Sequence, residues 1–317
     1  MNEQRNLYLA IGISIAIIIF FQFLFPTQPI QTTSLEEDEV LEPATSIDGQ
    51  GNETISEIKS RDEALIETDR VIFSNSSIEG SINLKGAILD DLILSKYKTS
   101  LEPGSDNIQL LLPEGTSNPY YIETGWKELK DTEVELPNLE TIWKTNSTTL
   151  TPSNPVTLSW TNNQNITFKI NYTIDDEYMF SITQEIENKG NSNIEVFPYR
   201  LIKRINTPDT INFFILHEGF ISLINDELLE KNYDDIADDC NSSMPSKKEF
   251  CDNKAQGGWL GFTDKYWMSA LIPDADQSIN VNYRYGNNGR DSYRAGYVGQ
   301  IYKVSSGETL EYGGKLF

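Results

Sequence analysis

The chain of 317 residues contains a single histidine and only two cysteines. With one imidazole, that of His217, it has little capacity for the serine or cysteine catalysis that depends on a histidine base. Two cysteines and one distant histidine also fall short of the four soft ligands of a structural zinc site. No glycine-rich segment follows a predicted strand and opens a helix, so there is no phosphate-binding loop. We therefore expect no metal and no cofactor.

Positive charge is scarce as well. The chain has 25 lysines and arginines against 48 aspartates and glutamates, which gives a net charge of −23. Such a surface repels the phosphate backbone of nucleic acids and the headgroups of anionic lipids. We expect no nucleic-acid partner, and we expect the body of the chain not to lie flat on a membrane. Acidity by itself keeps an exported protein soluble and indicates no particular ligand.

Long apolar runs are absent after Pro26, but one occupies Leu7–Phe25. At ~1.5 Å per helical residue it would be about 28 Å long, close to the hydrocarbon core of a bilayer. The run is longer than the apolar region of a cleaved signal peptide and ends in bulky residues. It therefore predicts an uncleaved anchor in the lipid bilayer, with its ends at Leu7 and Phe25. Arg5 precedes the run and the next basic residue is Lys59, which predicts a cytoplasmic segment 1–6 and an exported body.

Residues 26–69 are rich in Thr, Ser, Glu and Asp and contain no aromatic residue after the anchor. A segment of this composition buries too little apolar area to offset its conformational entropy. We predict a flexible acidic linker, with at most a weak helix over Glu57–Ile66.

The two cysteines, Cys240 and Cys251, enclose a loop rich in serine, proline and lysine. In an oxidising compartment a disulfide closing a loop of this size contributes about 3 kcal/mol to stability on the chain-entropy estimate. We favour this disulfide over two free thiols.

From Arg70 onward the hydrophobic period is two. In Asn165–Ile174, for example, large apolar side chains alternate with polar ones, which is typical of a half-buried antiparallel strand. Only Asn225–Lys231 has a pattern that suits a helix. Many short strands separated by turn residues predict an all-β fold, a large antiparallel sandwich over residues 70–317. Further strands are expected at 70–74, 81–94, 108–112, 156–160, 193–202, 211–216, 219–224, 266–272, 279–285, 293–303 and 307–312.

Polar clusters within the body receive structural interpretations. We take Asp90–Asp91 and Asp175–Asp176 as turn residues, and the aspartates of 234–239 as part of a solvated loop. We take His217 as a strand-end histidine bonded to the main chain rather than a proton carrier. The aromatic residues of the last third could line a groove for peptide or sugar, but we favour a place in the sandwich interior.

Three parts of the sequence carry a more specific pattern: Gly80–Leu94 with Asn118–Trp126, Asn206–Asp209 leading to Phe214–Gly219, and Gly257–Asp274. Together with Asn6–Ala10 ahead of the anchor, they resemble the periplasmic region of the YidC membrane protein insertases of Gram-negative bacteria, in order and in spacing. The third segment is the most specific. Its family-signature residues, which we expect to be structural, are Gly257, Gly258, Trp259, Asp264, Tyr266, Trp267 and Pro273.

The resemblance implies a β-supersandwich similar to galactose mutarotases, located in the periplasm and tethered to the inner membrane. It implies a membrane protein insertase and chaperone that receives nascent membrane proteins, alone or with the Sec translocon. The chain would supply the anchor and a periplasmic domain that docks Sec accessory proteins or acts as a spacer. We expect it to be part of a longer insertase, because the helices that form the inserting core of the family are not in this sequence.

An alternative function is a membrane-tethered periplasmic module that binds carbohydrate or peptide through the aromatic-rich last third. An enzyme is not expected. Sugar mutarotation needs a general acid and a general base across the ring, commonly His and Glu, and the chain has only His217.

Overall fold

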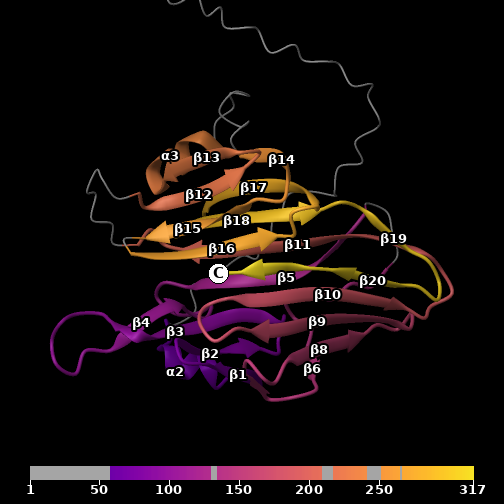
Figure 1. Cartoon of the computed structure of the whole chain (residues 1–317), viewed down its shortest axis with the longest axis horizontal. Helices are drawn as coiled ribbons and strands as arrows, with labels where there is room; N and C mark the ends of the chain where they lie inside the picture. The colour runs from indigo at the N-terminus through magenta and orange to yellow at the C-terminus, as the bar shows by residue number, and fades with distance from the viewer. Residues whose placement is uncertain (1–57, 130–133, 209–216, 241–250, 265) are drawn as a thin grey trace, which may run out of the picture. The chain divides into compact units, whose positions relative to one another are not determined.

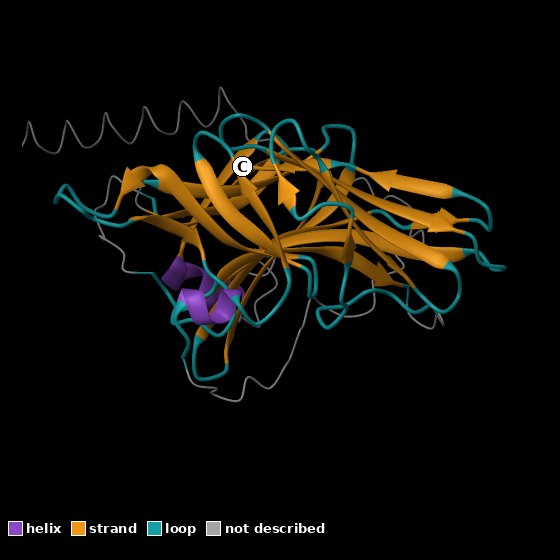
Figure 2. Cartoon of the chain, turned by 90° about the horizontal axis from the view of Figure 1, so that it is seen from below, coloured by secondary structure: helices purple, strands orange, loops and turns teal. Residues whose placement is uncertain are grey.

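The computed structural model describes residues 58–129, 134–208, 217–240, 251–264 and 266–317. These residues form two large β-sheets that pack face to face, with two short helices at the periphery (Figures 1 and 2). The predicted all-β sandwich is therefore confirmed. No helix among the described residues is long and apolar enough to cross a membrane. The predicted anchor at 7–25 and residues 26–57 of the predicted linker lie outside the described residues.

Sheet 1 has eleven strands, nine of which follow one path while β4 pairs with β3 and β19 pairs with β11. The strands, in spatial order and then the two side strands, are β14 (Asp252–Gln256), β17 (Ser278–Asn287), β18 (Asp291–Gly299), β11 (Ile194–Ile205), β5 (Tyr120–Glu128), β3 (Ile88–Lys98), β2 (Ile78–Asn83), β1 (Arg70–Ser74), β7 (Thr149–Leu150), β4 (Asn107–Leu111) and β19 (Tyr302–Val304).

Sheet 2 has ten strands, and here β20 pairs with β10 beside the main path. They are β13 (Glu227–Asn232), β12 (Gly219–Ile224), β15 (Trp259–Asp264), β16 (Trp267–Pro273), β21 (Gly314–Leu316), β10 (Phe180–Asn188), β9 (Ile166–Ile174), β8 (Val156–Thr161), β6 (Lys144–Thr145) and β20 (Thr309–Tyr312). Neighbouring strands are antiparallel in both sheets, except that β1 and β7 of sheet 1 pair in parallel.

The core lies between the sheets and follows the period-two pattern of the sequence. In β9 every second side chain from Ile166 to Ile174 is buried, as the alternation predicts. Phe73 of sheet 1 meets Phe180 of sheet 2 edge to face, with 5.1 Å between ring centroids. Three of the late aromatic residues, Tyr283, Tyr293 and Tyr297, are also buried, which agrees with the interior placement expected for them.

The predicted helical segment at Asn225–Lys231 is wrong. Its residues from Glu227 onward form β13, which pairs with β12 through a hairpin closed by Asn225 and Asp226. Both turn residues have positive φ, 52° and 63°, which matches the tight two-residue turns that join antiparallel strands. In β13, the last strand of its sheet, only Leu229 and Lys231 are half-buried and the other side chains are exposed. The exposed Leu228 directly beside the half-buried Leu229 removes the alternation from the sequence.

The two helices lie at different points of the chain, α2 before the first strand and α3 between β13 and β14. Helix α2 (Arg61–Leu65) precedes β1 and lies within the segment interpreted as linker. Helix α3 (Tyr233–Cys240) follows β13 and carries the aspartates of 234–239, so the predicted solvated loop is wrong at these positions. Its first two aspartates lie in the first turn, where the helix dipole favours negative charge. The predicted strand at 211–216 lies outside the described residues.

Candidate functional site

Most of the family-signature residues lie on the β15–β16 hairpin and at its entrance. Gly257 and Gly258 connect β14 of sheet 1 to β15 of sheet 2, so the chain changes sheets within two residues. Both have positive φ, 61° and 87°. A β-carbon on Gly258 would lie 2.4 Å from the carbonyl oxygen of Leu223. Both positions are therefore glycine because of the backbone conformation, and Gly258 also because of the close approach of β12.

Asp264, the last residue of β15, binds groups from two other elements. It forms an ion pair with Arg204 of β11 in sheet 1. Its second oxygen accepts a hydrogen bond from the hydroxyl of Tyr233, the first residue of α3, at 2.6 Å. Burial raises the pKa of Tyr233 well above its usual range, so the hydroxyl keeps the proton that it donates. Asp264 thus joins the hairpin, α3 and sheet 1 at one end of the sandwich.

The other side of the hairpin borders an apolar cavity of about 180 Å³ between the sheets. Trp267 packs edge to face against Tyr97 of β3, with 4.8 Å between ring centroids. Tyr266, with 69% of its surface exposed, and Phe317 also line the cavity. The interior of the cavity is formed by aliphatic and aromatic side chains of both sheets, with few polar atoms. It can take apolar groups but presents no acid–base pair.

Pro273, the remaining signature residue, ends β16 and pairs with Gly314 of β21. Trp259 begins β15 opposite Leu223. The structure therefore brings Asp264, Tyr266 and Trp267 together at one end of the hairpin and Gly257, Gly258 and Trp259 at the other. Their contacts are with the fold itself, and the chemistry of these side chains is packing and ion pairing.

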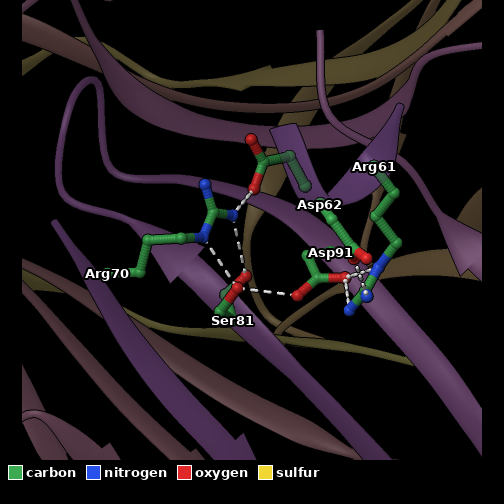
Figure 3. A network of polar contacts seen from close by, with 6 residues as sticks. Arg61, Asp62, Arg70, Ser81 and Asp91 are labelled. Carbon is green, nitrogen blue, oxygen red and sulfur yellow. Dashed lines mark hydrogen bonds and ion pairs between the residues drawn. The ribbon is translucent and has the colours of Figure 1, made fainter. Parts of the chain in front are cut away.

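A second polar cluster holds α2 on sheet 1 (Figure 3). Arg61 of α2 binds Asp91 of β3, with 2.6 Å between a guanidinium nitrogen and a carboxylate oxygen. Ser81 of β2 donates to the other oxygen of Asp91 at 2.7 Å and accepts from Arg70 of β1 at 2.7 Å. Arg70 also pairs with Asp90. We call these five residues the α2 clamp.

The prediction that Asp90 and Asp91 are turn residues is wrong, because both lie in β3 and are almost fully buried. A shift of register places Asp91 opposite Ser81 and Leu89 opposite Ile82, so Asp90 is the extra residue of a bulge. Burial raises the pKa of Asp90 to about 6, although Arg70 opposes the rise. The sequence predicted a turn because two adjacent aspartates are typical of turns, whereas a bulge leaves no recognisable pattern of hydrophobic residues.

The structure joins Cys240, at the end of α3, to Cys251, just before β14, by a disulfide with a Cα–Cα distance of 5.7 Å. His217 bonds to the main chain as expected, with 2.7 Å between its Nε2 and the carbonyl oxygen of Phe220. Among the described residues, no group of three or more His, Cys, Asp or Glu side chains could hold a metal ion. The anchor ends, Leu7 and Phe25, lie outside the described residues.

Comparison with known proteins points to one family. The family model of the YidC periplasmic domain matches residues 70–317. A membrane protein insertase YidC from Beijerinckia indica is 34% identical over 330 residues, covering 97% of this chain and 53% of that protein. A membrane protein insertase YidC from Pelagibacter ubique is 34% identical over 299 residues, covering 93% of this chain and 50% of that protein. The chain spans about half the length of the curated relatives it matches.

Solved structures with a similar course of the chain include a galactose mutarotase-like protein from Lactobacillus casei. It is 10% identical, with a TM-score of 0.47, and the match covers 78% of this chain and 99% of that one. A galactose mutarotase-related enzyme from Lactobacillus acidophilus gives a TM-score of 0.45 at 10% identity and covers 78% and 96%.

Proposed function

The chain belongs to the YidC periplasmic domain family, and from this premise we propose that it is part of a membrane protein insertase and chaperone of the inner membrane. The observation that carries the proposal is the extent of the match. The family model covers residues 70–317, and the Beijerinckia relative aligns with 97% of the chain, which includes most of the residues before the domain. An insertase lowers the free energy of moving polar groups into lipid and needs no bond chemistry.

We propose that the anchor at 7–25 holds the described domain on the periplasmic side, with residues 1–6 in the cytoplasm. Two features support this topology. Arg5 precedes the anchor, and basic residues near a membrane span tend to stay in the cytoplasm. The geometry of Cys240 and Cys251 suits a disulfide, and disulfides persist in oxidising compartments such as the periplasm.

We assign the insertion of client segments to the part of the relatives that this chain does not span. The described domain would dock accessory proteins of the Sec translocon. The α2 clamp suits this role because it fastens the residues just before the domain to sheet 1 through Arg61 and Asp91. The start of the domain is thereby held at a defined place on the sheet, and the linker before it can vary the distance to the membrane.

The proposal is tested by repressing the gene that encodes this chain and following the insertion of a single-span membrane protein by protease protection. We expect the protected fraction to fall on repression and to return when the gene is expressed again. The matched control is a secreted protein without a membrane span, whose export should change less. Unchanged insertion after loss of the protein would contradict the insertase assignment.

The alternative, a carbohydrate- or peptide-binding module, would use the cavity beside Trp267. Its test is the fluorescence of Trp267 in the presence of oligosaccharides, with Trp267→Phe to identify the signal. A saturable change that disappears in Trp267→Phe would favour the alternative, and we expect none.

A further inference from the structure

The apolar cavity between the sheets has an aliphatic interior. The buried residues that line it are aliphatic except for Phe180 and Ser269. They come from both sheets, as Leu94 of β3 and Leu316 of β21 do. An interior of this kind is favourable for hydrocarbon and offers almost nothing to a polar group.

The residues at the surface end of the cavity are mainly aromatic. Tyr97, Tyr266 and Phe317 are 43%, 69% and 44% exposed, and Tyr178 and Trp267 beside them are half-buried. Tyr97 packs against Trp267, and Tyr178 packs against Phe317 with 6.4 Å between ring centroids. We call these five residues the aromatic mouth. Tyrosine and tryptophan combine an apolar ring with a polar tip, which suits a boundary between an apolar interior and water.

The described lining lacks the groups that recognise sugars or extended peptides. It includes no acidic, basic or histidine side chain. Beside the mouth, the main-chain groups of Ala270 and Phe317 bond to each other in both directions, at 2.7 and 2.9 Å. An extended peptide therefore cannot add a strand at this point. A sugar in the interior would lose its hydrogen bonds to water without replacing them.

The size of the cavity restricts its occupant further. Pockets for drug-sized ligands measure about 300–1,000 Å³, and this cavity measures about 180 Å³. A dry protein cavity of about 150 Å³ holds one benzene molecule, so this one holds about six to eight carbon atoms. It has room for part of one hydrocarbon chain and not for two.

We propose that the cavity binds the hydrocarbon chain of a single-chain amphiphile with an uncharged or zwitterionic head. The chain fills the aliphatic interior, and the aromatic mouth surrounds the point where the chain meets its head, which stays in water. The net charge of −23 disfavours an anionic head. It also keeps the body of the chain away from an anionic bilayer, so the amphiphile is taken up as a free monomer.

This binding site does not depend on the insertase assignment. Uptake of an amphiphile is measured with this chain alone, so its failure leaves the proposed role in membrane protein insertion untouched, and the reverse also holds.

The experiment uses the full chain in lipid nanodiscs and the straight-chain alcohols from butanol to dodecanol as probes. Empty nanodiscs correct for partitioning into lipid, and the difference between the wild type and Trp267→Phe isolates the fluorescence of Trp267. We expect the affinity to rise about three- to fourfold with each added methylene group. The rise should stop at about eight carbons, where the cavity is full. The absence of a saturable signal would overturn the proposal, as would a rise that continues through dodecanol.

Two substitutions of Leu110, a half-buried residue of β4 that lines the cavity, should move this limit in opposite directions. Leu110→Ala enlarges the cavity and should lengthen the limiting chain by about two carbons, and Leu110→Phe should shorten it by about two. The matched control is Ile72→Ala, which removes a side chain that is 52% exposed on β1 and does not line the cavity. Cooperative urea unfolding identifies the variants that are folded. A limit that is the same in the wild type and in each folded variant of Leu110 would overturn the proposal.

Two other occupants are distinguished in the same preparation. Quenching of Trp267 by nanodisc lipids brominated in their acyl chains, without added alcohol, would assign the cavity to a bilayer lipid and overturn the proposed source. The peptide acetyl-Ala-Phe-Ala-amide carries one aromatic side chain on an uncharged main chain. Displacement of octanol by this peptide at a lower concentration than by hexanol would overturn the assignment to a hydrocarbon chain. We expect neither result.

Discussion

Arg200 of β11 donates a hydrogen bond to the main-chain carbonyl of Ile182 on β10, 2.8 Å away across the interior of the sandwich. At this point β10 has no partner on one side, because it pairs with β20 from Gln184 onward and with β21 before Ile182. The guanidinium also bonds to Gln184 at 3.2 Å and lies within 3.4 Å of the carbonyl oxygen of Tyr312. A fully buried arginine thus supplies donors where the strand ladder is interrupted.

We predict that Arg200→Met destabilises the domain by about 2–4 kcal/mol, since buried carbonyl groups lose their donors. Urea unfolding measures the change. The control is Lys189→Met, whose side chain is 67% exposed and which should shift stability by less than about 0.5 kcal/mol. A variant as stable as the wild type would contradict this prediction and show that the desolvation cost of the buried cation fully offsets its hydrogen bonds.

The raised pKa of Asp90 predicts a defined pH dependence. Its ordinary value is 3.8 and the folded value is about 6, because burial disfavours the charged form. The folded state therefore binds this proton more tightly than the unfolded state, and the associated stability is present below 3.8 and lost as the pH rises to 6. Relative to Asp90→Asn, the wild type should lose roughly 3 kcal/mol across this interval.

Urea unfolding of the wild type and of Asp90→Asn at several pH values measures the difference in their free energies of unfolding. The contributions of other titrating groups are the same in both proteins and cancel in this difference. A wild type that gains stability relative to Asp90→Asn over the same interval would show that the ion pair with Arg70 outweighs burial.

The change of sheet at Gly257–Gly258 can be tested with a matched pair of glycines. Gly258 and Gly289 have the same φ of 87°, but a β-carbon would meet the carbonyl of Leu223 at 2.4 Å in the first case and nothing within 4 Å in the second. Gly289→Ala should lose about 1 kcal/mol from the left-handed backbone alone. Gly258→Ala should lose at least about 2 kcal/mol more, because the backbone must move. If thermal unfolding shows the same loss of stability for Gly258→Ala and Gly289→Ala, no steric contact at Gly258 fixes the passage of the chain from sheet 1 to sheet 2.

The α2 clamp predicts a local effect. Arg61→Ala removes the contact with Asp91 and should increase hydrogen exchange and proteolysis at residues 61–69 without changing global unfolding. Asp62→Ala is the control. The side chain of Asp62 is 92% exposed, and its carboxylate comes no closer than 3.5 Å to the guanidinium of Arg61. If the two variants exchange alike, the helix is held by its capping box at Ser60 and not by the clamp.

The sequence predicts those features of the fold that are local. Alternation identifies β9 and β10, since each has one buried face. It misses the edge strand β13, in which the exposed Leu228 stands beside the half-buried Leu229, and it misses the bulge at Asp90. It also cannot predict that β10 pairs with strands from the end of the chain, because such pairing depends on contacts distant in sequence.

The candidate site shows the same division. The resemblance identifies Asp264 and Trp267, but their partners Arg204 and Tyr97 lie on strands far away in the sequence. The sequence does not identify Arg200, because an isolated Arg in an alternating strand looks like an outward-facing polar residue. Only the packing of β11 against β10 shows that Arg200 is buried and bonded to Ile182.

The central claim, a membrane-anchored domain on the periplasmic side, is tested most directly by labelling one introduced thiol. Leu101 is fully exposed in the connection between β3 and β4, and the native cysteines are joined in a disulfide, so Leu101→Cys provides a single reactive site. In cells with a permeabilised outer membrane, a membrane-impermeant maleimide should label this variant, and the labelled chain should remain with the membranes after carbonate extraction. Labelling only after lysis of the inner membrane, or recovery of the chain in the soluble fraction, would contradict the account.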